Sequence, residues 1–475
     1  MGLLRRFVFF SFLLTLSPSL LAAESDPATL ISLTHSWVGV TALIVFVLAY
    51  SLVVAEEFTH LRKSKPVILA AGIIWAMIGV AYARQGIDHA AEEAVREFVA
   101  EFGELFLFLL AAMTYVNAMN ERRVFEGLRT WLIRKGFGYR RLFLITGVIS
   151  FCLSPMIDNL TTALVMCAVV MAVGKSNTRF IGLGCINIVV AANAGGAFSP
   201  FGDITTLMVW QAGIISFSTF FSLLVPAALN YAVPATAMYF SVPDEVPPPS
   251  DESIRIKRGA YTILALFALT IFTAVSFHNF LHLPPFLGMM TGLGYLKFYG
   301  FYLKKTHKPH PLDSEEYGMV GDVGAFDSFQ QVQRAEWDTL LFFFGVIMCV
   351  GGLGFIGYLA EVSQWMYIDL GPTLANSLVG IMSAVVDNIP VMVAVLQMDP
   401  LMDVQQWLLV TLTAGVGGSM LSIGSAAGVA LMGQSRGNYT FFGHLKWTPF
   451  IALGYVLSIV VHLWINQRFG GVMPG

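Results

Sequence analysis

The sequence predicts an all-α polytopic membrane protein with an inverted-topology repeat, two re-entrant hairpins and two discontinuous helices. Three observations predict this fold class: an apolar composition, basic residues that order the spans, and two related polar breaks. Apolar residues make up 56% of the 475 residues and charged residues 12%, whereas soluble domains are less apolar and more charged. A net charge of −3 gives no support for nucleic-acid binding. Composition therefore predicts that the chain lies in a lipid bilayer.

The first 23 residues form a segment that is distinct from the expected spans. Arg5 and Arg6 precede the apolar run Phe7–Leu16, and a small-residue cleavage site follows at Leu21–Ala23. This layout is typical of a secretory signal peptide. An uncleaved first anchor is the alternative, and in both cases residues 24–35 begin outside the cytoplasm.

Basic residues order the spans of the next part, residues 24–141, which we expect to form scaffold helices. The expected spans are Trp37–Ala55, Pro66–Ala83 and Leu105–Met119. Cytoplasmic loops carry an excess of lysine and arginine, so the loop that contains Lys63 lies inside. An acidic stretch follows the second span and a basic amphipathic segment follows the third. The three spans therefore end inside, outside and inside.

The first repeat, residues 142–240, begins with the apolar segment Leu142–Gly174. Basic residues flank both ends, and the segment is too short for two full spans. Two arms of about 13–15 residues would reach just past the membrane centre, with the tip at Ser154–Asn159. A re-entrant hairpin explains this pattern, because irregular backbone at that depth needs protein or a water-filled cavity beside it. The next apolar segment, Phe180–Gln211, is interrupted at Gly195–Asp203 and predicts a discontinuous helix.

A proline-rich cytoplasmic linker at residues 241–258 separates the two halves. Residues 259–372 are expected to add scaffold spans, and residues 373–475 to form a second hairpin, a second discontinuous helix and a last span. The second hairpin has its tip at Ser383–Asn388 and aspartates at its flanks, so it enters from outside. The expected segments are Ala260–Leu281, Pro284–Leu303, Trp337–Tyr358, Thr373–Gln397, Val404–Gln434 and Trp447–Asn466.

The two halves share a pattern. The spacing of Ser154, Asp158 and Asn159 recurs in the tip of the second hairpin, and three glycines recur in register between 195–203 and 417–425. The charge pattern places the two hairpins on opposite sides of the membrane. Related halves of opposite orientation are the architecture of many secondary transporters.

Three aspartates lie in these breaks, Asp158, Asp203 and Asp387, with no lysine, arginine or histidine among them. Carboxylates inside a membrane are costly and mark ion pathways. Hard cations favour oxygen ligands, whereas an anion site would use cationic side chains or helix N-termini. The sequence therefore predicts a site for a cation or a proton. The oxygen and amide candidates beside the aspartates are Ser154, Asn159, Thr161, Thr162, Asn193, Thr205, Thr206, Ser383, Asn388, Ser422 and Ser425.

Other roles are open for several of these residues. Intramembrane Ser, Thr and Asn often only hold helices together, which applies to Thr161, Thr162 and Thr206. Asp387 also reads as the N-cap of a half-helix. Three further carboxylates are accessory or regulatory candidates, or simply solvated charges at span ends: Glu104, Glu336 and Asp338.

The paired Asp-Asn tips, with Gly202-Asp203-Ile204-Thr205-Thr206 in the broken helix, resemble the NhaD-type sodium/proton antiporters of the ion transporter superfamily, which includes arsenite and dicarboxylate carriers. The resemblance implies exchange of Na⁺ or Li⁺ for H⁺ across the bacterial inner membrane, without a cofactor or enzymatic residues. It also implies a homodimer whose transport parts move like elevators. Dicarboxylate carriers typically have Ser-Asn-Thr at the tips, where this chain has Asp.

With this resemblance, Asp158, Asp203 and an assisting Asp387 form the expected Na⁺ site. A buried carboxylate favours its protonated form, whereas a bound cation favours the ionised form. Competition between Na⁺ and protons for the same coupled carboxylates would link the two fluxes.

Three alternatives compete with an antiporter. A sodium-coupled anion carrier, for a dicarboxylate or an oxyanion, would share the architecture, as would an arsenite pump subunit. Paired intramembrane aspartates also occur in aspartyl proteases, but Gly202-Asp203 lacks the Gly-x-Gly-Asp motif and Asp158 lacks a preceding tyrosine.

Overall fold

The protein is described here from a computed structural model. The structure describes residues 32–59, 61–87, 89–174, 177–247, 256–306 and 326–474, and all regular secondary structure in these ranges is helical. Nine of the described helices are long and apolar enough to cross a membrane. The predicted all-α polytopic class is therefore confirmed. The predicted signal peptide at residues 1–23 lies outside the described residues.

The first half of the chain supplies the helices before the linker. They are α2 (Trp37–Val54), α3 (Glu56–Thr59), α4 (Ser64–Arg84), α5 (Ala90–Glu121), α6 (Val124–Arg134), α7 (Tyr139–Ile157), α8 (Asn159–Gly174), α9 (Thr178–Gly196), α10 (Ile204–Gln211), the 3₁₀-helix η1 (Phe217–Leu223) and α11 (Leu224–Tyr239).

The second half supplies the helices after the linker. They are α12 (Ala260–Leu281), α13 (Pro285–Lys305), α14 (Ser328–Gln333), α15 (Trp337–Phe355), α16 (Tyr358–Ser363), the π-helix η2 (Gln364–Asp369), α17 (Pro372–Ser383), α18 (Asn388–Met398), α19 (Val404–Gly417), α20 (Ala426–Gln434), α21 (Phe441–Leu445), α22 (Thr448–Ile465) and the 3₁₀-helix η3 (Gln467–Phe469).

Both predicted tips join two helices. Asp158 separates α7 from α8 with a positive φ of 67°, and residues 384–387 separate α17 from α18. The arms of the first pair have 19 and 16 residues, more than the 13–15 expected, because α7 begins at Tyr139 and includes two arginines. The arms of the second pair have 12 and 11 residues.

Both predicted breaks are also present. α9 ends at Gly196 and α10 begins after Asp203, which accepts a hydrogen bond from the backbone N–H of Thr205. In the same way α19 ends at Gly417 and α20 begins after Ser425, which caps α20 through the N–H of Gly428. Asp203 and Ser425 therefore hold equivalent places at the start of the second helical piece.

Each tip is tied to its broken helix by a serine. Ser154 Oγ donates to the carbonyl of Ala192 at 2.6 Å, and Ser383 Oγ donates to the carbonyl of Ala414 at 2.7 Å. Both serines are fully buried. Because each bond fixes a tip beside a break, the polar residues of the tip and the break share one region.

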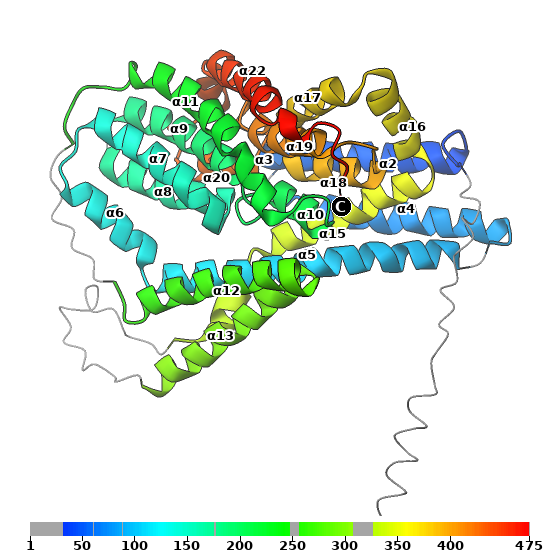
Figure 1. Ribbon diagram of the computed structural model, residues 1–475, viewed down its shortest axis with the longest axis horizontal. Helices are drawn as coiled ribbons and strands as arrows, with labels where there is room; N and C mark the ends of the chain where they lie inside the picture. The colour runs from blue at the N-terminus through cyan, green and yellow to red at the C-terminus, as the bar shows by residue number, and fades with distance from the viewer. Residues whose placement is uncertain are drawn as a thin grey trace, which may run out of the picture.

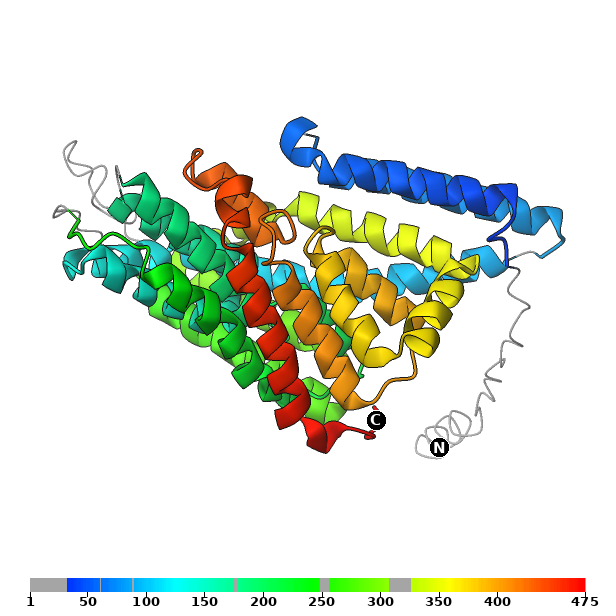
Figure 2. The ribbon, with the colours of Figure 1, turned by 90° about the horizontal axis from the view of Figure 1, so that it is seen from above.

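The two halves are interleaved around the breaks. α7 and α9 pack together, as do α17 and α19, but α10 packs against α18 and α20 packs against α8. Figure 1 shows α7, α8, α9 and α11 on one side of the molecule and α16 to α19 on the other, and Figure 2 shows the same helices from above. Each second helical piece thus contacts the hairpin of the other half.

A second group of helices packs beside the helices that carry the tips and the breaks (Figure 1). α5 is 32 residues long and packs against α12, α13 and α15, while α15 also packs against α4. α12 and α13 lie side by side along α5 in Figure 1. The acidic stretch, expected between two spans, is instead part of α5, which begins at Ala90.

Close backbone packing of α17 and α19 predicts a measurable effect of one methyl group. A Cβ at Gly417 would overlap the carbonyl oxygen of Gly380, and overpacking of this kind costs about 1–3 kcal/mol. We expect Gly417→Ala to lower the thermal unfolding temperature of the purified protein in detergent. Gly294→Ala in α13 is the control, because a Cβ there meets nothing within 4 Å. Equal melting temperatures for the two variants would contradict the close approach.

Candidate functional site

Asp203 lies at the centre of the site, where the two hairpins and both breaks meet. Its side chain is nearly fully buried. Asn159 Nδ2 of the first hairpin donates to Oδ2 at 3.1 Å. Asn388 Nδ2 of the second hairpin donates to Oδ2 at 3.0 Å and to Oδ1 at 3.2 Å. The asparagines at equivalent places in the two tips therefore converge on one carboxylate.

A second row of hydrogen bonds connects the two breaks. Asn193, near the end of α9, accepts from Asn159 Nδ2 at 3.2 Å and donates to Ser425 Oγ at 3.0 Å. Asn193 and Ser425 are almost completely buried. The structure thus brings together six predicted residues in one network, namely Asn159, Asn193, Asp203, Thr205, Asn388 and Ser425.

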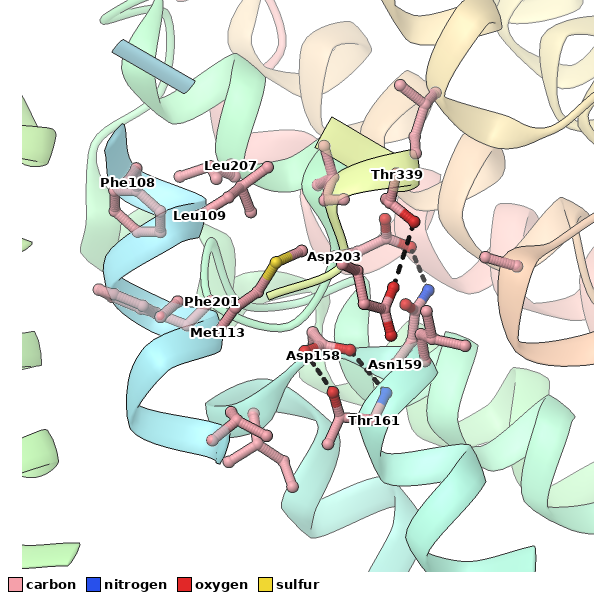
Figure 3. Close-up of a pocket in the computed structure, with 18 of the residues that line it drawn as sticks. Phe108, Leu109, Met113, Asp158, Asn159, Thr161, Phe201, Asp203, Leu207 and Thr339 are labelled. Carbon is pink, nitrogen blue, oxygen red and sulfur yellow. Dashed lines mark hydrogen bonds between the residues drawn. The ribbon is translucent and has the colours of Figure 1, made fainter. Parts of the chain in front are cut away.

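Asp158 faces the same space but has its own donors. Its Oδ1 accepts from the backbone N–H of Thr161 at 2.7 Å, and its Oδ2 accepts from Thr161 Oγ1 at 2.9 Å. Figure 3 shows Asp158, Thr161 and Asp203 around one pocket. Thr161, which the sequence left open as a packing residue, thus binds a carboxylate of the site directly.

This pocket has a volume of about 90 Å³. Asp158, Asn159 and Asp203 line it on the side of the breaks, and apolar residues of α5 line it opposite, including Phe108 and Met113. A polar space of this size can hold water molecules. The charged residues of its lining are Lys63, Asp158, Asp203 and Glu336.

Asp387 belongs to an adjoining cavity of about 300 Å³. Its Oδ2 lies 3.5 Å from Lys63 Nζ, and both side chains are 14% exposed. Lys63 and Glu336 line both cavities. The interpretation that the site contains no cationic side chain is therefore wrong: Lys63 reaches it from the start of α4.

The predicted hydroxyl ligands divide into two groups. Ser154 and Ser383 donate to backbone carbonyls, so their part in the site is to fix the tips. Thr162, Thr205, Thr206 and Ser422 are fully buried, and their hydroxyls have no hydrogen-bond partner among the described residues. Buried hydroxyls without a partner are rare because they lose their bonds to water, but these four residues line neither of the two cavities.

The three accessory carboxylates lie at different places. Glu336 precedes α15 and accepts from Thr339 Oγ1 at 3.1 Å. Asp338, in the first turn of α15, accepts a hydrogen bond from Ser64 Oγ and lines the 300 Å³ cavity. Glu104 lies apart from these cavities, in a separate cavity of about 570 Å³ between α5, α10, α15 and α18.

Sequence reasoning placed Lys63 in a loop and did not connect it with the site. The pair with Asp387 joins residues that are 324 positions apart, and no local pattern signals it. One signal for the role of Thr161 was available. A threonine three residues after an aspartate supplies a backbone N–H and a hydroxyl to that carboxylate, as in other Asx motifs.

Comparison with known proteins identifies the family. A protein of Alkalimonas amylolytica named Na⁺/H⁺ antiporter NhaD is 57% identical over 464 residues, which are 95% of each chain. This chain belongs to the NhaD family. NhaD proteins of Vibrio cholerae and Halomonas elongata are 55% and 56% identical, over 96% and 94% of this chain and 98% and 92% of their own. A family model described as citrate transporter also matches residues 28–415 of this chain.

Because both hairpins donate to Asp203, substitutions of Asn388 and Asp203 should have coupled effects on the stability of the protein. This coupling can be measured without a transport assay. Asn388→Ala removes a donor from a buried carboxylate, which costs about 1.5–3 kcal/mol for a bond to a charged group. We expect a lower unfolding temperature for this variant and almost no added effect in an Asp203→Ala background, because the lost bond then has no acceptor. Asn120→Ala, at an exposed end of α5, is the control. If the two substitutions lowered the unfolding temperature additively, the hydrogen bond between Asn388 and Asp203 would contribute nothing to stability.

Proposed function

We propose that this chain is a secondary active antiporter that exports cytoplasmic Na⁺, and also Li⁺, in exchange for protons. The observation that carries the proposal is the buried Asp203 carboxylate, shared by both hairpins and set beside Asp158 in one small pocket. High identity to proteins named Na⁺/H⁺ antiporter NhaD supports the same function. The chain needs no cofactor and no covalent chemistry for this exchange.

The charge of the pocket supports a cation as substrate. Its lining contains three carboxylates and one ammonium, a net charge of −2 when all are ionised. An anion that entered would meet three carboxylates against the single ammonium of Lys63, and such like-charge contacts select against a ligand. These features favour a small cation over the carboxylate named by the family model.

The proposed mechanism is competition at Asp158 and Asp203, with Asp387 in the adjoining cavity. Na⁺ binds when the carboxylates are ionised. When the ion leaves, protons replace it, because buried carboxylates without a counter-charge favour the protonated form. The carboxylates then cross the membrane neutral in one direction and with the ion in the other, which couples the fluxes.

We also propose that the two halves form an inverted-topology repeat with re-entrant hairpins. The matching serine bonds, capping residues and tip asparagines support this arrangement. In this arrangement residues 24–141 and 259–372 form the scaffold, and residues 142–240 and 373–475 form the transport part. A homodimer in the bacterial inner membrane agrees with the resemblance to the family.

The decisive experiment uses inside-out vesicles from cells that lack other antiporters, with an acid-interior pH gradient reported by a dye. NaCl and LiCl should release protons from the wild-type vesicles, whereas KCl and succinate serve as tests of selectivity and of the anion carrier. Asp203→Asn should abolish the release because it removes the charge that the cation needs. Asp244→Asn, an exposed carboxylate paired with Arg140, should retain it. Uptake of succinate without a cation response would contradict the antiporter.

The same vesicle assay measures the competition between Na⁺ and protons for the carboxylates. Because protons and Na⁺ share the carboxylates, each unit fall in pH should raise the half-saturating Na⁺ concentration by up to about tenfold for each proton displaced. Dye responses at several external pH values give this slope. A half-saturating concentration that stays constant with pH would show that Na⁺ and protons bind to separate groups.

A further inference from the structure

The Asp387 carboxylate lacks the hydrogen-bond donors that its counterpart Asp158 has. Three residues after Asp158 stands Thr161, which donates both its backbone N–H and its hydroxyl to the carboxylate. Three residues after Asp387 stands Pro390, which has neither an N–H nor a hydroxyl. The second tip therefore cannot provide the donors that the first tip provides.

Lys63 supplies what the second tip lacks. Its ammonium lies 3.5 Å from Asp387 Oδ2 and 4.5 Å from the centre of the Phe342 ring. Asp387 Oδ1 has no hydrogen-bond partner among the described residues. One long contact leaves half of this carboxylate open, so the ion pair can exchange with another cation.

The pair also connects two different groups of helices. Lys63 is the N-cap residue of α4, which packs against α2 and α15, whereas Asp387 precedes α18 of the second hairpin. Both residues line the 300 Å³ cavity, together with Glu56, Glu336 and Asp338. A displaced ammonium therefore has three other carboxylates near it and does not become an unpaired buried charge.

We infer that Lys63 is a tethered substitute for the transported cation at Asp387. When the site holds no Na⁺, the Lys63 ammonium occupies this carboxylate. When Na⁺ arrives, it displaces the ammonium and separates α4 from the second hairpin. Lys63 is thus a positioning residue that sets the apparent affinity for Na⁺. This inference rests on the proposed function.

The test compares the Na⁺ response of variants in the inside-out vesicles. Lys63→Met removes the competing charge but keeps the apolar stem, so the half-saturating Na⁺ concentration should fall by about tenfold. Lys63→Arg keeps the charge and should stay close to the wild type. Lys65→Met is the matched control, because Lys65 is an exposed lysine two positions away. A fall of equal size for Lys65→Met would overturn the inference in favour of a general charge effect.

Restoring a positive charge at position 63 distinguishes competition between Lys63 and Na⁺ from a structural role of the Lys63 side chain. Lys63→Cys in a Cys152→Ser background keeps only buried native cysteines. Modification with aminoethyl methanethiosulfonate adds an ammonium at this position and should raise the half-saturating Na⁺ concentration back towards the wild-type value. The neutral methyl methanethiosulfonate should not. Equal effects of both reagents would overturn the inference, since they would show that bulk and not charge matters.

Failure of this inference differs from failure of the proposed function. Wild-type vesicles without any response to Na⁺ or Li⁺ would contradict the antiporter itself. Active wild-type vesicles with an unchanged or higher half-saturating concentration in Lys63→Met would refute only the role of Lys63. Thermal unfolding of purified Lys63→Met in detergent confirms that the compared protein is folded.

Discussion

A buried carboxylate has to be surrounded by hydrogen-bond donors, and Asp203 imposes this constraint on the protein. Its donors are the amides of Asn159 and Asn388 and the N–H of Thr205. The amides come from two hairpins that are far apart in the sequence, so the carboxylate can be satisfied only when both halves are in place. Removal of one donor leaves a charge that the apolar surroundings cannot stabilise.

The rest of the site follows from this requirement. Both tips must approach both breaks, and the serine bonds from Ser154 and Ser383 hold them there. Helices come this close only where side chains are absent, which explains Gly417 beside the carbonyl of Gly380. The broken helices in turn free the backbone at Asp203 and Ser425, so that each caps a new helical piece.

Much of this arrangement can be predicted from the sequence, because three glycines in register mark both breaks inside apolar segments, and the first break also contains Pro200 and Asp203. Flanking charge, segment length and the repeated Ser-Asp-Asn spacing predict the tips at Asp158 and Asp387, and they place Asn159 and Asn388 beside these aspartates. The Lys63–Asp387 pair was not, since positive charge at a span end predicts only a loop, whereas the long lysine side chain reaches beyond that end. The start of α5 was also missed, because the charge pattern of the acidic stretch marks an outer side but does not separate helix from loop.

The sharing of Asp203 also has a consequence for the order of events during synthesis. Asn388 follows Asp203 by 185 residues, and chains grow at about 5–20 residues per second. For roughly 10–40 s the new carboxylate therefore has Asn159 but not its second amide partner. During this time the hydrogen-bond network around Asp203 in the first half is incomplete. It is completed when the second half packs against the first, including α20 against α8. Insertion of the second hairpin is thus the step that completes the first half as well as the second.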